Sequence, residues 1–334
     1  MKNPWDIDRN NYPKDGSLAN KIRFVLGYGI LAPSTHNTQP WLFKIKENSV
    51  EIYYDPKLML PEGDPRSRDL YISMGCLIEN TLIAAGHFKI LDRFDVGLRD
   101  SLVAEIFFKE EGNNYEYADL LDTIPQRVNS RGLFKPNLIP EDSVQKTLSL
   151  NDFEGIEIHR VSDKERILKF AELTASGLKM AHGRPRFRQE MSRWMHNSLS
   201  PAKEGLHGYS LRMPFLFSFI IPWLVRFRDL SPMLADLNYK SIASVPLVNV
   251  ISAQESNPET WLKVGRLAQR TMLYLNSQNI KTSIFVASIE MGDLHKEVQK
   301  LLNITTEPQF LFVAGYMDYD QKHSPRHNLE EKLL

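Results

Sequence analysis

The segment at residues 32–43, APSTHNTQPWLF, combines two prolines with a run of short polar side chains and constrains the fold around it. Apolar residues recur at helical spacing from residue 18 to residue 31, and Pro33 predicts that this helix ends there. Residues 42–45 and 50–54 have the composition of strands and flank a polar turn, which predicts a hairpin. We therefore expect the polar residues to form a loop between a helix and a sheet.

Length and charge are those of an ordinary globular protein. The chain has 334 residues, 42% of them hydrophobic, which suggests about two domains. Lys+Arg and Asp+Glu are both 41, so no overall field favours nucleic acid, and any anion site must be local. Cys76 is the only cysteine, which excludes an intramolecular disulfide and a cysteine-based zinc or iron–sulfur site. With no H-E-x-x-H pattern among its histidines, the chain is predicted to bind no metal.

Two segments bear on membranes and targeting. The first residues lack the apolar stretch of a secretory signal, so we expect a cytoplasmic protein. The longest apolar run, residues 213–225, contains two prolines and is shorter than the roughly 20 residues that a spanning helix needs. We predict a buried or inter-domain helix there and no transmembrane segment, with a mobile lid and an interfacial membrane contact as the alternatives.

The order of the predicted elements is similar in the two halves of the chain. In the first half the patterns predict a helix at 71–86 and strands at 94–98 and 102–108. In the second half they predict helices at 141–150, 163–179 and 261–276, and strands at 157–161, 243–252 and 309–315. Ser162 or Asp163 could cap the helix that follows. The acidic segment 110–122 is a plausible boundary, so we expect two α+β units.

A glycine pattern at residues 27–32, GYGILA, matches the dinucleotide fingerprint of Rossmann folds. That fingerprint requires a preceding strand and a following helix N-terminus, where free backbone N–H groups meet the pyrophosphate. Here the preceding stretch is helical and Pro33 follows at once. We therefore reject a Rossmann site.

The polar loop suits a polyhydroxyl or heterocyclic ligand. The amides of Asn37 and Gln39 both donate and accept hydrogen bonds, and Ser34 and Thr35 add hydroxyl groups. The alternative is a loop whose side chains only satisfy their own backbone, as serine, threonine and asparagine often do. His36 could face a ligand or solvent, whereas Cys76 lies in an apolar helix and is expected in the core.

Three segments resemble the nitroreductase-type FMN flavoproteins. Residues 32–43 resemble the segment of that family in which Ser, Asn and Gln contact the flavin. Residues 127–131, RVNSR, with Phe134 and residues 139–141, resemble its phosphate-binding segment, and residues 324–326, SPR, resemble its C-terminal basic element. The resemblance implies FMN as the cofactor and the following contacts: Pro33, Ser34, Thr35, Asn37, Gln39, Arg127, Val128, Asn129, Arg131 and Arg326.

The order of these segments resembles the two-domain, Acg-type branch of the family. In a single-domain nitroreductase the arginine-rich segment comes first and the flavin lies at a dimer interface, whereas here it follows the polar loop by about 90 residues. The resemblance implies an α+β fold of two fused nitroreductase-like domains, 1–122 and 123–334, that form an intramolecular pseudo-dimer. The first would serve the flavin ring and ribityl chain, and the second the phosphate. One intact site is expected, since the second half has no copy of the loop.

The resemblance also implies a reaction. FMN would accept hydride at N5 from NADH or NADPH and pass reducing equivalents to a nitroaromatic, a quinone or a related acceptor, with no catalytic side chain required. The alternative is an FMN storage or sequestering protein, in which residues 184–228 form a lid over the flavin and prevent turnover. Both a monomer and a further homodimer are compatible with one site per chain.

Overall fold

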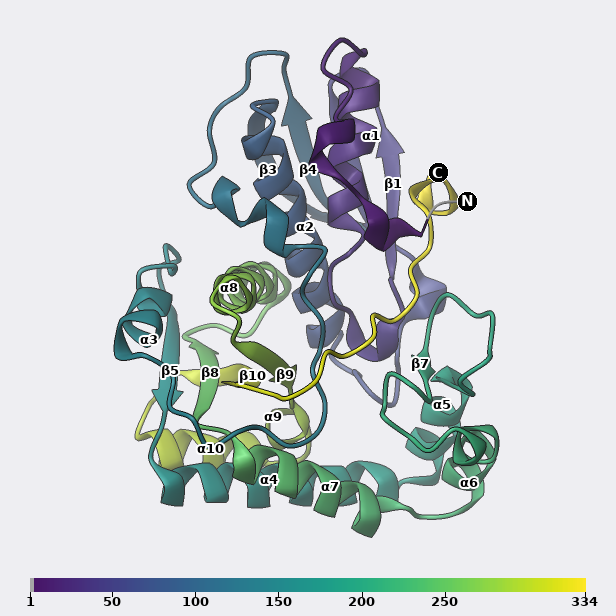
Figure 1. The fold of residues 1–334 in the computed structure, drawn as a ribbon, viewed down its shortest axis with the longest axis vertical. Coiled ribbons are helices and arrows are strands. Elements are labelled where there is room, and N and C mark those ends of the chain that lie inside the picture. The colour runs from purple at the N-terminus through teal and green to yellow at the C-terminus, as the bar shows by residue number, and fades with distance from the viewer. Residues whose placement is uncertain (1–2) are drawn as a thin grey trace.

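Two four-stranded antiparallel sheets, joined by a pair of central helices, make up the protein (Figure 1). The structure is a computed structural model and describes residues 3–334. The first sheet lies in the upper part of the view in Figure 1 and the second in the lower part, with the central helices between them, and a layer of further helices covers the outer face of the second sheet. The predicted α+β class is confirmed.

The first half follows the patterns of the sequence closely. Its strands pair in the order β1-β2-β4-β3, and β1 and β2 form the predicted hairpin, with Phe43 opposite Ile52. Ser17 caps the first helix by accepting a hydrogen bond from the backbone N–H of Asn20. The elements are α1 (Leu18–Gly29), β1 (Trp41–Ile45), β2 (Ser49–Tyr54), α2 (Arg68–His87), β3 (Leu91–Arg99) and β4 (Leu102–Phe108).

The second half contains a sheet of the same kind and, between α4 and α7, a long insertion at residues 184–228. The strands pair in the order β5-β8-β10-β9, and a short separate pair, β6 and β7, lies in the insertion. As predicted, Asp163 caps the helix after β5. The elements are α3 (Glu141–Leu148), β5 (Ile156–Val161), α4 (Lys164–Gly183), α5 (Pro185–Trp194), β6 (Met195–His196), β7 (Leu206–His207), α6 (Ile221–Phe227), α7 (Ser231–Ser244), β8 (Leu247–Ala253), α8 (Pro258–Ser277), β9 (Lys281–Ile284), α9 (Ala287–Glu290), α10 (Leu294–Leu302) and β10 (Glu307–Gly315).

The two halves share the same order of strands and helix, and their central helices, α2 and α8, cross at a pair of glycines. In each half a 20-residue helix connects the second strand to the third, and the strand order within the sheet is the same. A Cβ atom on Gly75 would lie 2.2 Å from the carbonyl oxygen of Leu262, and one on Gly265 would lie 2.1 Å from that of Ile72. This reciprocal contact supports the interpretation as two related halves, for which we propose the division at residues 122 and 123.

A buried ion pair lies in the same helix contact. The carboxylate of Glu79 on α2 accepts from Arg270 at 2.7 Å and from Arg266 at 2.9 Å, both on α8. The hydroxyl of Tyr115 donates to the same carboxylate at 2.7 Å. The side chains of Glu79 and Arg270 are both fully buried, so neither charge can be solvated if the other is removed. The halves are therefore held together by charge as well as by apolar packing.

Three predictions about elements need correction. Strand β9 was missed because its four residues are too few to show an alternating pattern. The predicted strand over 243–252 begins too early, since residues 243 and 244 end α7. The buried helix predicted over 213–225 is wrong, because the two prolines divide the run into a 3-10 turn (Leu216–Phe219) and α6, and many of its apolar side chains are exposed.

The C-terminal segment after β10 connects the halves a second time. It leaves the second sheet, crosses the molecule and ends beside β1 (Figure 1), where the N–H of Leu334 donates to the carbonyl oxygen of Phe43 at 2.8 Å. This path brings Arg326 next to the polar loop. Within residues 3–334, no helix is long and apolar enough to cross a membrane.

Candidate functional site

A cavity of about 280 Å³ lies between the two halves. The loop after α1 and the start of α2 form one wall, and residues from α4, β9, α9 and the C-terminal segment form the others. The volume is near the lower end of the range of small-molecule sites. Nine of the ten predicted ligand-binding residues line it: Pro33, Ser34, Thr35, Asn37, Arg127, Val128, Asn129, Arg131 and Arg326.

The polar loop is held in an unusual backbone conformation. His36, Asn37 and Gln39 have φ values of 51°, 57° and 50°, in the left-handed region that residues other than glycine seldom adopt. Ser34 Oγ accepts from the N–H of Gln39 at 2.9 Å, and Thr35 Oγ1 donates to Asp69 at 3.2 Å. The loop thus partly satisfies its own backbone, as the alternative interpretation expected, and it also forms a wall of the cavity. Strain of this kind concentrates at functional sites.

Three arginines line the cavity without a carboxylate partner within residues 3–334. Among the described residues, the guanidinium of Arg127 donates only to the carbonyl oxygen of Leu31, at 3.2 Å. Arg326 donates to the carbonyl oxygen of Ala32 at 3.1 Å and to the side-chain oxygen of Asn37. In the described part of the chain the guanidinium of Arg131 makes no hydrogen bond or ion pair, and the Nε atoms of Arg127 and Arg326 are buried without a partner.

These charges make the cavity strongly positive. Burial, and then the nearby charge of Arg127, lower the pKa of Arg326 to about 9. Burial lowers the pKa of Arg127 to about 10 and also lowers the pKa of Arg131. The ring of His323 stacks on Trp5, and burial followed by these arginine charges lowers its pKa to about 4, so it is neutral at physiological pH. Buried charges are normally paired, so this cluster is suited to a bound anion.

A pair of acidic side chains faces the cavity from another side. Asp69 lies in the first turn of α2 and Glu290 at the end of α9, and both line the cavity. Burial and then the charge of Asp69 raise the pKa of Glu290 well above its usual range, and a hydrogen bond joins the two carboxyl groups. Arg68 lies 3.4 Å from Glu290. One proton shared by this pair gives a hydrogen bond to two buried oxygens, Asp69 Oδ1 and Glu290 Oε1, whose other polar contacts are the longer ion pairs with Arg68.

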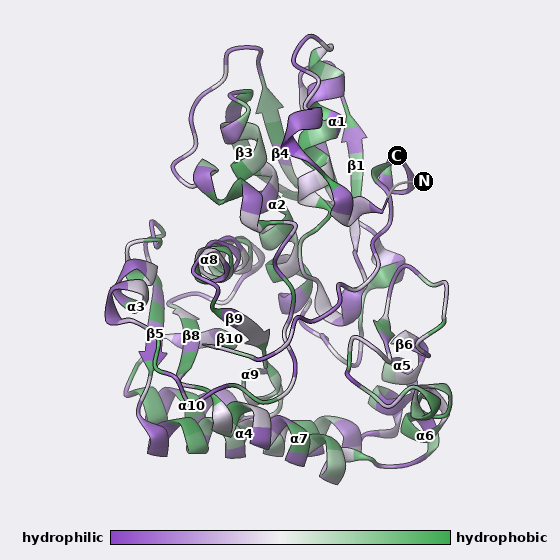
Figure 2. Cartoon of the chain, viewed as in Figure 1, coloured by the Kyte–Doolittle hydropathy of each residue, from purple (hydrophilic) through white to green (hydrophobic). Residues whose placement is uncertain are grey.

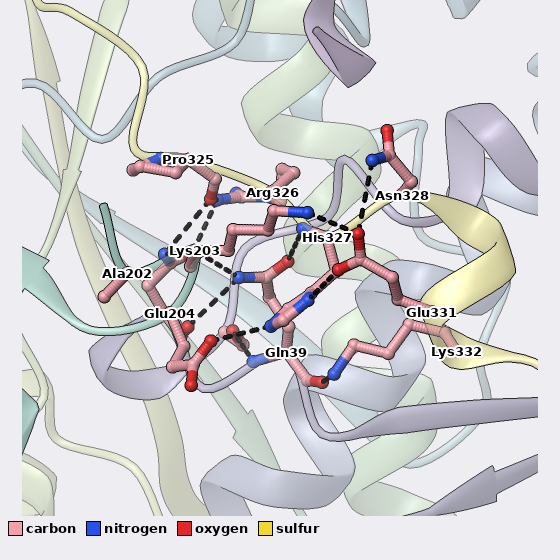
Figure 3. A network of polar contacts seen from close by, with 12 residues as sticks. Gln39, Ala202, Lys203, Glu204, Pro325, Arg326, His327, Asn328, Glu331 and Lys332 are labelled. Carbon is pink, nitrogen blue, oxygen red and sulfur yellow. Dashed lines mark hydrogen bonds and ion pairs between the residues drawn. The ribbon is translucent and has the colours of Figure 1, made fainter. Parts of the chain in front are cut away.

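Gln39 does not line the cavity, and its contact with a flavin stays a prediction. Its amide nitrogen donates to the carbonyl oxygen of Lys203 at 2.7 Å, and its amide oxygen accepts from the N–H of His327 at 2.9 Å (Figure 3). Lys332 donates to its backbone oxygen at 2.8 Å. With both ends of its amide hydrogen-bonded, Gln39 connects the polar loop to the insertion and to the C-terminal segment.

A network of charged side chains around Gln39 joins residues 203 and 204 to the C-terminal segment (Figure 3). His327 lies between Glu204, at 2.7 Å, and Glu331, at 2.6 Å, and Lys203 forms an ion pair with Glu331. Lys203 and then His327 lower the pKa of Glu331 to about 2. The network therefore holds residues 203 and 204 of the insertion against the C-terminal segment.

The insertion contributes a wall of the cavity. Four of its side chains line the cavity: Phe187, Met191, Leu206 and Ser210. Glu190 fixes this part of the insertion to the first half, because its carboxylate accepts from the backbone N–H groups of Gly63 at 2.7 Å and Glu62 at 3.1 Å. The segment that we predicted as a lid, 184–228, thus covers one side of the site.

Some cavity residues had no signal in the sequence. Asp69, Glu290 and His323 come from elements far apart in the chain, and no local pattern distinguishes them. Cys76 is buried, as expected, and it also lines the cavity. Burial raises the pKa of its thiol to about 12, so it is not a nucleophile at neutral pH.

Comparisons with known proteins agree with the resemblance seen in the sequence. No family model matches the chain. It is 36% identical over 66 residues to two proteins of Mycobacterium tuberculosis, strains CDC 1551 and H37Rv, each named "Putative NAD(P)H nitroreductase". The matched stretch is 20% of this chain and 19% of each relative, so it confirms the resemblance over about a fifth of either protein.

Solved structures with a partial likeness include two flavin enzymes. The FMN-dependent nitroreductase NfnB of Mycobacterium smegmatis, in complex with NADPH, is 19% identical with a TM-score of 0.42, over 65% of this chain and 97% of that one. The NADPH:FMN oxidoreductase of Vibrio harveyi, complexed with NAD+, is 12% identical with a TM-score of 0.39, over 62% and 73%.

Proposed function

We propose that this protein is an FMN-dependent oxidoreductase of nitroreductase type that binds one FMN between its two halves. The observation that carries the proposal is the cluster of Arg127, Arg131 and Arg326, which line one cavity and have no carboxylate partner within residues 3–334. Guanidinium groups bind phosphate oxygens in bidentate geometry, and a phosphate carries the charge that this cluster lacks. The arginines would hold the FMN phosphate, and residues 33–37 would contact the ring and ribityl chain.

Binding energetics require both parts of the site. A charge-assisted hydrogen bond contributes about 1.5–3 kcal/mol, whereas micromolar affinity corresponds to about 8 kcal/mol after the costs of ordering are met. The arginines alone barely reach that value. Contacts with the ring must therefore contribute, and the walls formed by the polar loop, Asn129, Ile284 and Phe285 are placed to supply them.

When bound, FMN supplies hydride transfer between NADH or NADPH and an acceptor such as a nitroaromatic or a quinone. The chain's own residues would bind and orient the reactants and exclude water. Glu290 holds a proton at the cavity wall, and Asp69, which accepts from Thr35, orients it. We propose this pair as a proton reservoir at the cavity wall. The cytoplasm remains the proposed location of the protein.

A specific observation favours a second candidate, an FMN storage or sequestering protein. The insertion lines the cavity with Phe187, Met191, Leu206 and Ser210 and is fastened through Glu190 and Lys203. If these contacts hold the insertion closed over the flavin, a nicotinamide ring cannot stack on it. The two candidates share one binding site and differ in whether the site admits a second ligand.

Anaerobic mixing of the FMN-loaded protein with NADH or NADPH distinguishes them. The oxidoreductase proposal predicts that the visible absorption of the flavin bleaches and returns when a quinone or nitroaromatic is added. A bound flavin that neither nucleotide bleaches supports storage and contradicts the oxidoreductase. A protein that does not bind added FMN contradicts both.

A further inference from the structure

Six large apolar side chains of the insertion are exposed on one short stretch of chain, and we name them the α6 patch. Leu216 is 79% exposed and Trp223 is 61% exposed. Residues as apolar as these are seldom exposed together on a monomer, and such patches mark interaction sites. The members, each about half exposed or more, are Phe215, Leu216, Phe219, Ile220, Trp223 and Phe227.

The inner face of α6, beneath the α6 patch, is packed in a buried apolar cluster. Ile221 and Val225, on the inner face of α6, are fully buried in a cluster with Met195. The hydroxyl of Ser218 accepts from the N–H of Ser198 and fixes the preceding turn. The outer side chains therefore cannot collapse inward. Helix α6 lies at the edge of the molecule, beyond the end of α7 (Figure 1), and the ribbon there is coloured largely as hydrophobic (Figure 2).

Positive charge surrounds the α6 patch. Residues 184–228 contain eight Lys and Arg against two Asp and Glu, in a chain whose overall charge is +0. Arg226 and Arg228 flank Phe227, and Arg193 lies in the last turn of the neighbouring helix α5. The nearest acidic residue in the sequence is the exposed Asp229. All three arginines are exposed, and none forms an ion pair with an acidic side chain in the described part of the chain. Their charges are therefore free to bind an anionic partner.

We propose that the α6 patch binds an anionic lipid bilayer. The aromatic and aliphatic side chains would enter the boundary between headgroups and acyl chains, while the arginines would contact lipid phosphates. Since no helix within residues 3–334 can cross a membrane, the contact would be peripheral. Met191 packs in the same cluster as α6 and also lines the cavity, so docking would bring that wall of the cavity towards the membrane.

A second copy of the chain fits the same surface less well. A two-fold interface through this surface would bring Arg226 and Arg228 of both copies together, with one exposed acidic residue, Asp229, beside them in each copy. The arginines outnumber the acidic side chains there, and like charges at an interface are costly. A bilayer with acidic headgroups supplies the opposite charge and adapts to the shape of the apolar side chains. Charge complementarity therefore favours lipid over self-association.

Sedimentation with vesicles tests this proposal on the full chain. We expect binding to phosphatidylcholine vesicles that contain phosphatidylglycerol, weaker binding as salt is raised, and little binding to phosphatidylcholine alone. The double variant Trp223→Glu with Phe227→Glu should lower the partition coefficient by about tenfold or more. Replacing Arg226 and Arg228 with Gln should lower it by about fivefold each. Leu138→Glu is the matched control, because Leu138 is 78% exposed but lies outside the patch.

Three results would overturn the proposal. The first is absence of binding to anionic vesicles at low salt, and the second is equal binding by the Trp223/Phe227 double variant whose circular dichroism and melting match the parent. The third is a concentration-dependent dimer in sedimentation velocity that the double variant abolishes, in a protein that does not bind vesicles. That last result would assign the patch to a second copy of the chain. None of these results depends on FMN binding.

Discussion

Replacing Arg131 with Met should separate FMN affinity from folding stability. The Arg131 guanidinium makes no hydrogen bond or ion pair within residues 3–334, so its removal breaks no internal contact. We therefore expect the free energy of unfolding of the flavin-free protein to change by no more than about 0.5 kcal/mol. Loss of one charge-assisted phosphate contact, about 1.5–3 kcal/mol, should weaken FMN binding by about 10- to 150-fold.

Titration calorimetry with FMN and with riboflavin gives the sharpest assay of that prediction. Riboflavin lacks the phosphate, so Arg131→Met should leave riboflavin affinity close to that of the parent protein. Arg226→Met is the matched control, because Arg226 is exposed and lies outside the cavity. Equal weakening for both ligands would show that Arg131 contacts the ring or acts through the fold, and unchanged FMN affinity would refute the phosphate assignment.

Three further predictions concern the helix contact and the acidic pair. Glu79→Ala should lower the free energy of unfolding in urea by about 3–5 kcal/mol, because it removes the fully buried partner of Arg270 and leaves that charge only the half-exposed Asp152, 2.6 Å away; a change below 1 kcal/mol would contradict the buried pair. Gly265→Ala should cost about 3 kcal/mol, since its Cβ would meet backbone at 2.1 Å, whereas Gly183→Ala, with nothing within 4 Å, should cost little; equal melting temperatures would refute the close crossing. Glu290 has a raised pKa in the folded state, so the folded protein binds more protons than the unfolded chain, and stability should fall as pH rises from the ordinary glutamate range through the folded pKa. Glu290→Gln should flatten that pH dependence in urea titrations, and parallel curves for the two proteins would contradict the shared proton.

Local patterning explains why much of the fold could be predicted. The hairpin β1–β2 and strand β4 have the composition and patterning of strands. Helix α2 is recognised by its long apolar run, and nearly all of its residues are buried. Strand β9 has only four residues, and its pairing with β10 depends on a partner about 30 residues away. For the apolar run at 213–225, length and composition excluded a spanning helix but could not show which side chains face outward.

Site residues that lie in short sequence motifs could be predicted, whereas those brought together only by folding could not. Segments 33–37 and 127–131 carry their polar residues in short, compact motifs, and all nine predicted residues other than Gln39 line one cavity. The partners of Gln39, Lys203 and His327, are 164 and 288 residues away, so its role as a connecting side chain could not be read locally. Asp69 and Glu290 meet only through the packing of α2 and α9, and burial produces the shift in the pKa of Glu290.

A crystal structure of the protein with added FMN tests the central claim most directly. We predict one FMN per chain between the halves, with phosphate oxygens within hydrogen-bonding distance of Arg127, Arg131 and Arg326 and the ring against residues 33–37. A flavin bound elsewhere, two flavins per chain, or a phosphate that contacts none of the three arginines would contradict the account.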